Sequence, residues 1–82
     1  MSKSQAEKRK LKEFGGNVRR ARVAANLTQE KLAEKCSLNP RTIQKIEAGD
    51  IAILVFTLVR LQAALACNWG DLLGPEAKRR AL

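Results

Sequence analysis

The sequence predicts an all-α fold, a single domain built from five short helices. No segment alternates apolar and polar residues with the period of two that a half-buried strand requires. Signals that begin and end helices recur at short intervals along the chain. The chain has 82 residues, of which 45% are hydrophobic and 29% are charged, a composition typical of one folded domain.

The first helix is predicted from about Lys10 to Ala25. Its apolar positions are spaced four, three and four residues apart: Phe14, Val18, Ala21 and Ala25. Gly15 and Gly16 lie within this pattern and each costs about 1 kcal/mol relative to Ala, so a start near Gly16 is the alternative. Residues 1–13 then form a basic N-terminal extension, either an arm that binds DNA or a solvated, disordered tail.

Two capped helices follow. Thr28 is a suitable N-cap for a second helix from Gln29 to Cys36. Asn39 is a suitable N-cap for a third helix from Pro40 to Ala48, because proline at the first helical position loses no hydrogen bond. Gly49 is the expected left-handed C-cap of this third helix.

The fourth helix is predicted to begin at Ile51 or Leu54 and to end near Ala66, with Asp50 as the cap if it begins early. One apolar face suffices for the core: Val55, Leu58, Leu61 and Leu65. A second apolar stripe runs along another side: Ala52, Phe56, Val59, Ala63 and Ala66. Because a helix that is apolar nearly all round is buried on two sides, the second stripe predicts a homodimer interface. The alternative is that the first helix or the C-terminal tail covers it.

A short fifth helix is predicted after Asn68, because Asp71 follows three residues later in the pattern of a capping box. This helix should end at Gly74, and Trp69 is expected to fill the core. The boundaries expected from these elements are an extension over residues 1–13, a folded domain over 14–74 and a basic tail over 75–82.

Basic residues outnumber acidic ones, and most of the excess is N-terminal. The chain has a net charge of +8, and its first 22 residues hold eight of the 16 Lys and Arg residues but two of the eight Asp and Glu residues. This charge predicts a polyanionic partner. Aromatic residues, at 4% of the chain, are too few for stacking on single-stranded bases.

The composition also argues against catalysis. There is no His, so the usual general base and the commonest metal ligand are missing. Cys36 and Cys67 lack the spacing of a metal site, and we expect them to be thiols that act as small hydrophobic residues rather than redox sensors. The longest apolar run, Ile51 to Val59, is too short to cross a bilayer. We therefore expect a cytoplasmic protein that is not an enzyme, with no cofactor, no metal and no membrane contact.

The second and third predicted helices have the spacing of a helix-turn-helix, with a three-residue turn between them. Their inward apolar residues are Leu32, Ala33, Cys36, Leu38, Ile43 and Ile46. The segment LTQEKLAEKCSLNPRTIQKIEAG, Leu27 to Gly49, resembles the DNA-binding domain of the phage Cro and repressor-like family, also called the XRE family. The flanking segments NVRRAR and TLVRLQAALACNWGDLL extend the resemblance over Phe14 to Gly74.

The resemblance implies a role for each matched position. The base-contacting residues are Arg41, Thr42, Gln44 and Lys45, although an ordinary solvated helix face is an equally good interpretation of the last two. The phosphate-contacting residues are Thr28, Gln29, Asn39 and Arg19. A structural ion pair joins Arg22 to Glu47. Three positions depart from the family: Ser37 where glycine is usual, Ile53 where proline is usual, and Leu54 where Ser or Thr caps the helix.

These observations favour sequence-specific binding to double-stranded DNA by a small dimeric transcriptional regulator, of the phage-repressor or restriction-modification-controller type. The expected operator is near-palindromic. The alternative is an antitoxin-like interaction protein that holds a protein partner through its apolar fourth helix and binds DNA secondarily. Non-specific coating of nucleic acid by charge alone fits the composition but ignores the helix-turn-helix motif.

Overall fold

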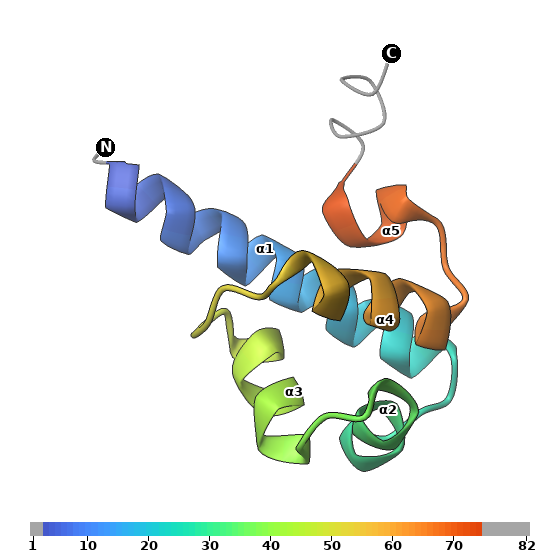
Figure 1. Cartoon of the computed structure of the whole chain (residues 1–82). Helices are drawn as coiled ribbons and strands as arrows, with labels where there is room; N and C mark the ends of the chain where they lie inside the picture. The colour runs from blue at the N-terminus through green and yellow to red at the C-terminus, as the bar shows by residue number, and fades with distance from the viewer. Residues whose placement is uncertain (1–2, 75–82) are drawn as a thin grey trace.

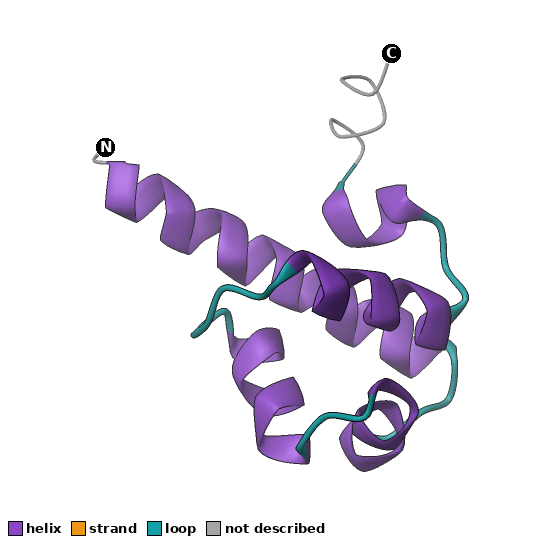
Figure 2. Cartoon of the chain, in the orientation of Figure 1, coloured by secondary structure: helices purple, strands orange, loops and turns teal. Residues whose placement is uncertain are grey.

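The computed structural model describes residues 3–74, which form five helices and no strand (Figure 1; Figure 2). The helices are α1 (Lys3–Ala24), α2 (Gln29–Cys36), α3 (Pro40–Ala48), α4 (Val55–Leu65) and α5 (Trp69–Leu73). The all-α, five-helix prediction is therefore confirmed. The basic tail predicted over residues 75–82 lies outside the described residues.

All five helices contribute to one hydrophobic core. α1 packs against α3 on one side and α5 on the other, while α2 packs against α3 and α4 (Figure 1). The buried core residues are Val18, Leu32, Ala33, Cys36, Ile43, Ile46, Leu61, Leu65 and Leu72. α2 to α5 have at most 11 residues each and are too short to be stable alone in water, so this shared core is what maintains them.

The caps of the two central helices are as predicted. The Thr28 hydroxyl accepts a hydrogen bond from the Lys31 backbone N–H at 3.0 Å, and Asn39 Oδ1 accepts one from the Arg41 backbone N–H at 2.8 Å. The C-cap residues are Ser37 for α2 and Gly49 for α3, both in the left-handed region with φ of 56° and 76°. Ser37 thus adopts the strained conformation for which glycine is favoured.

The prediction for the first helix was wrong at its start and correct within one residue at its end. α1 begins at Lys3 and runs without interruption through both glycines, and it ends at Ala24, so that Ala25 is exposed outside it. The two alternatives for residues 1–13, an arm or a disordered tail, both overlooked this helix. Gly15 is buried where α1 crosses the end of α3, and a Cβ placed there would lie 2.6 Å from the Glu47 carbonyl oxygen. This close packing of the two backbones offsets the poor helix propensity of glycine.

The fourth helix also differs from its prediction. It begins at Val55 after an extended segment, and its N-cap residue, Leu54, supplies no side-chain hydrogen bond, so the early start capped by Asp50 was wrong. Ile51 and Ile53 of the extended segment pack against the core. Val55 was expected to face the core but is 73% exposed, so Ile51 and Ile53 fill the core at this end of α4 instead.

The fifth helix forms where the capping box predicted it, with the Asp71 carboxylate accepting a hydrogen bond from the Asn68 backbone N–H at 3.1 Å. Trp69 at its first position is 42% exposed, so the expectation that it fills the core was wrong. Leu72 is the residue of α5 that enters the core.

Replacing each of the two adjacent glycines of α1 by alanine should change the free energy of unfolding in opposite directions. Gly15→Ala should destabilise the fold by about 1 to 3 kcal/mol, because the new methyl group meets the backbone of α3. Gly16→Ala should stabilise it by about 1 kcal/mol, because its Cβ meets only the Arg20 side chain, at 3.6 Å. Urea unfolding followed by circular dichroism measures both effects. Equal stability of the two variants would contradict the close contact between α1 and α3.

Candidate nucleic-acid interface

The turn between α2 and α3 places α3 across α2 with one face outward. Ala33 of α2 is fully buried, and its small side chain lets the two helices pack closely. Ile43 and Ile46 turn the inner face of α3 toward the core, and Leu38 packs over the turn. The opposite face of α3 is therefore left exposed.

Four side chains of α3 were predicted to contact bases. Arg41, Gln44 and Lys45 are exposed, and Thr42 is half-buried. Because they are three and four residues apart, Arg41, Gln44 and Lys45 lie next to one another on one side of the helix. The outer face of α3 thus presents two cations and an amide, groups that bind the acceptor-rich edges of bases in a major groove.

The four predicted phosphate-contacting residues lie on three different elements. Thr28 and Asn39 are the exposed N-caps of α2 and α3, at the ends where each helix has its first backbone N–H groups. Arg19 is exposed on α1. Gln29 is half-buried at the start of α2, and its amide Nε2 donates a hydrogen bond to Glu47 Oε1 at 3.1 Å.

An ion pair joins α1 to α3. Arg22 Nε donates to Glu47 Oε2 at 2.6 Å, and Arg22 Nη2 donates to Glu47 Oε1 at 3.1 Å. The two side chains are only 13% and 5% exposed. The hydrogen bond to Glu47 raises the pKa of the Arg22 guanidinium above its ordinary value. Since Arg22 Nη1 also donates to the Leu27 carbonyl at 2.9 Å, the pair ties the end of α1 to the loop that precedes α2.

The structure therefore combines two roles that the sequence analysis had separated. Gln29 belongs to the same hydrogen-bonded cluster as Arg22 and Glu47. Eighteen residues separate Gln29 from Glu47, and no local pattern connects them. The cluster fixes the start of α2 relative to the end of α3. The sequence analysis did not predict this structural role of Gln29.

The described residues contain no group of three His, Cys, Asp or Glu side chains able to hold a metal ion. Burial raises the pKa of the Cys36 thiol, and burial and the nearby Asp71 carboxylate raise that of Cys67. Both cysteines are free. Within residues 3–74, no helix combines the length and apolar character needed to cross a membrane.

These features define a helix-turn-helix unit of the kind that binds DNA: two helices at a three-residue turn, a rigidly held second helix, and an exposed polar face on it. A family model described as helix-turn-helix matches residues 18–72, about two thirds of the chain. The protein belongs to this family, the XRE family of Cro- and repressor-like DNA-binding transcription regulators. Comparison with curated proteins and with solved structures gives no match.

The buried ion pair predicts an unusual pattern of stabilities. Arg22→Met should lower the free energy of unfolding by about 3 to 5 kcal/mol, because it leaves the Glu47 carboxylate buried without its partner. The double variant Arg22→Met, Glu47→Leu should be more stable than Arg22→Met alone, because no buried charge is left unpaired. Chemical unfolding of the wild type, both single variants and the double variant measures the coupling. A double variant less stable than either single variant would contradict this account.

Proposed function

We propose that the protein binds one duplex DNA sequence specifically, as a small transcriptional regulator that acts by binding rather than by catalysis. The observation that carries the proposal is the outer face of α3, where Arg41, Gln44 and Lys45 are exposed side by side on a helix fixed at both ends. An α-helix of this kind fits the major groove of B-DNA, whose base edges identify each base pair.

The proposed contacts follow from where the side chains lie. Arg41 is at the second position of α3 and is suited to a bidentate pair with guanine O6 and N7. Thr42, Gln44 and Lys45 lie within the next turn and contact neighbouring bases or phosphates. The N-termini of α2 and α3, with Thr28, Gln29 and Asn39, bind phosphates through backbone N–H groups and side chains. Glu47 accepts the Gln29 bond and so orients that side chain.

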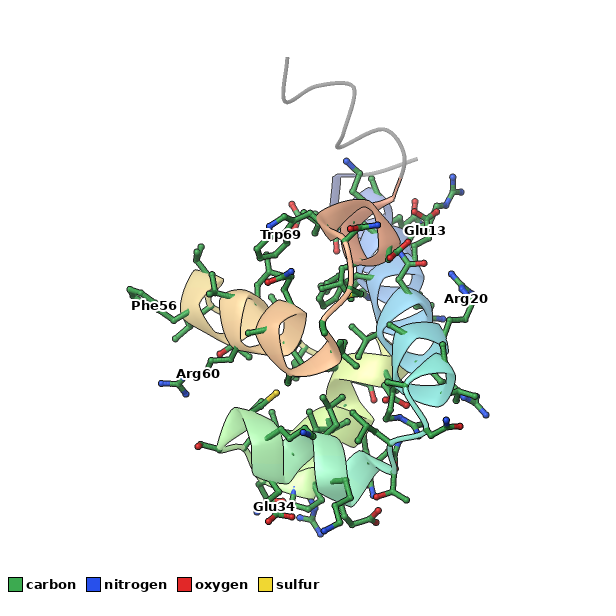
Figure 3. The ribbon with its side chains drawn as sticks, turned by 90° about the vertical axis from the view of Figure 1, so that its right-hand side faces the viewer. Glu13, Arg20, Glu34, Phe56, Arg60 and Trp69 are labelled. Carbon is green, nitrogen blue, oxygen red and sulfur yellow. The ribbon has the colours of Figure 1, made fainter. Side chains whose placement is uncertain are left out.

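We further propose that the regulator is a homodimer that pairs through α4. Phe56 is 77% exposed and points away from the body of the protein (Figure 3). Val59 lies one turn further along and is exposed, as is Ala63, whereas Ala52, which was predicted on the same helical stripe, is exposed in the extended segment before α4. Burying this stripe against a second copy removes apolar surface from water. Two-fold pairing that sets the two α3 helices about 34 Å apart matches a near-palindromic operator of the phage-repressor or restriction-modification-controller type.

A second candidate partner is a different protein. The same exposed stripe of α4 supports an antitoxin-like role, in which Phe56 and Val59 bind another polypeptide and DNA binding is secondary. The oligomeric state of the purified protein separates the two proposals. A stable dimer favours self-association, and a monomer that sediments as a 1:1 complex with a co-expressed second polypeptide favours the alternative.

Arg41→Ala should change the selected DNA sequence at one base pair in each half-site. The loss of a bidentate contact should cost about 1 to 3 kcal/mol of discrimination against the wrong base. Selection of bound sites from random duplex DNA measures this. The control is Arg20→Ala, which removes the same charge from the side of α1 that faces away from α4 (Figure 3). An unchanged preference for Arg41→Ala would show that Arg41 does not contact a base.

Phe56→Lys should give a folded monomer with strongly weakened operator binding, because it places a charge in the proposed interface without altering α3. Analytical ultracentrifugation and DNA titration measure the two effects. The control is Val23→Lys, which replaces an exposed apolar residue of α1 by the same charge. A Phe56→Lys protein that dimerises like the wild type would exclude α4 as the interface.

A further inference from the structure

The N-terminal half of α1 has no counterpart in the matched family region, which begins at residue 18. It forms a helix that extends past the other helices (Figure 1). Lys8, Arg9, Lys10 and Lys12 are all exposed on it. The two ion pairs found among residues 3–74, Arg22 with Glu47 and Lys31 with Glu34, include none of these cations.

One face of α1 is defined by its contact with α3. Gly15 touches the backbone of α3 at Ile46 and Glu47, and Arg22 is paired with Glu47. Residues spaced by three and four lie on the same side of a helix. The row continues in both directions from Gly15 at spacings of four, three, four and three: Lys8, Lys12, Gly15, Arg19 and Arg22.

This row brings cations to the edge of the α3 surface. Lys12 lies against Gly49, the residue that ends α3, since a Cβ on Gly49 would be 2.7 Å from the Lys12 Cα. Lys8 is one turn further along, beyond the end of α3. Arg19 lies between the two contacts of α1 with α3 and is exposed. The row from Lys8 to Arg19 spans about 16 Å along the helix axis.

The position of these charges is unfavourable for the helix itself. Lys8 and Lys12 are four residues apart on α1, and like charges at this spacing destabilise a helix. The first turn of α1 contains no acidic residue to compensate. Most of this segment is exposed, so burial contributes little to it. A polyanion bound along this side of α1 would offset the repulsion between these cations.

We propose that Lys8 and Lys12, in line with the predicted phosphate-contacting residue Arg19, form a second contact surface for the phosphate backbone of duplex DNA, continuous with the α3 face and independent of base sequence. The inference rests on the proposed function, because it places the duplex against α3. Each strand presents one phosphate per 3.4 Å of helix axis, so a 16 Å row meets several phosphates. The row thus extends the bound segment beyond the bases that α3 contacts.

The test compares two double variants of the full chain that remove the same charge from different faces of α1. Lys8→Gln with Lys12→Gln changes the row. Lys10→Gln with Arg20→Gln is the control, because Lys10 lies on the opposite side of the helix from Lys8 and Arg20 lies on the side away from α4 (Figure 3). Glutamine keeps a similar helix propensity, and circular dichroism checks the helix content of both proteins.

The measurement is the slope of log K against log salt concentration on the selected operator and on random duplex DNA. The row variant should reduce the magnitude of the slope by about 2 per bound protomer, roughly one unit per lysine and so about 4 for a dimer, while the selected sequence stays the same. The control should leave the slope close to that of the wild type. Equal reductions in both variants, or no reduction in either, would overturn the proposal.

The outcome separates this inference from the proposed function. A wild-type protein that shows no sequence preference refutes specific binding, and the slopes on random DNA still decide whether the row contacts phosphate. A wild-type protein with a clear preference and an unchanged slope in the row variant refutes the row alone. A changed sequence preference in the row variant also overturns the proposal, because it shows a contact with bases.

Discussion

The crossing of α1 over the C-terminal end of α3 is the contact on which the rest of the structure depends. At this point the two backbones touch, and only glycine fits at position 15. One and two turns further along α1, Arg19 stays exposed and Arg22 pairs with the buried Glu47 carboxylate. The contact therefore combines close packing with a paired charge, and each requires the other helix to be in one position.

The DNA-binding surface follows from this constraint. α3 has nine residues and would not be stable alone. Its inner face is held by Ile43 and Ile46, its N-terminus by Asn39, and its C-terminal end by the ion pair. Because Glu47 also accepts a hydrogen bond from Gln29, the start of α2 is fixed with it. A helix held in this way can present Arg41 in one orientation, which sequence-specific contact with bases requires.

The proposed DNA contacts and the proposed dimer contact lie on different helices. Lys8, Lys12 and Arg19 of α1 continue the row that packs against α3, whereas Phe56 of α4 points away from the body of the protein (Figure 3). This separation is consistent with the two proposed contacts, with DNA and with a second copy, being made at the same time. A substitution on α4 can then affect DNA binding through assembly without altering the face of α3.

The sequence by itself determined the features that depend on neighbouring residues. The caps at Thr28 and Asn39, the left-handed C-cap at Gly49 and the three-residue turn use interactions that close within a few residues, and each was predicted at its observed position. The helix-turn-helix spacing and the exposed polar positions of α3 followed from these boundaries. The family resemblance supplied Arg22 and Glu47 as partners, which local periodicity alone does not show.

Tertiary structure alone decided the features that depend on distant residues. Gly15 and Gly16 disfavour helix formation and therefore predicted a late start for α1. Close packing against the backbone of α3, some thirty residues away, offsets this low helix propensity at Gly15. The extended segment before α4 sends Ile51 and Ile53 toward the core and leaves Val55 exposed, a choice between apolar residues that composition cannot make. The bond from Gln29 to Glu47 has the same origin. In each case the deciding free energy comes from packing or pairing between segments that only the folded chain brings together.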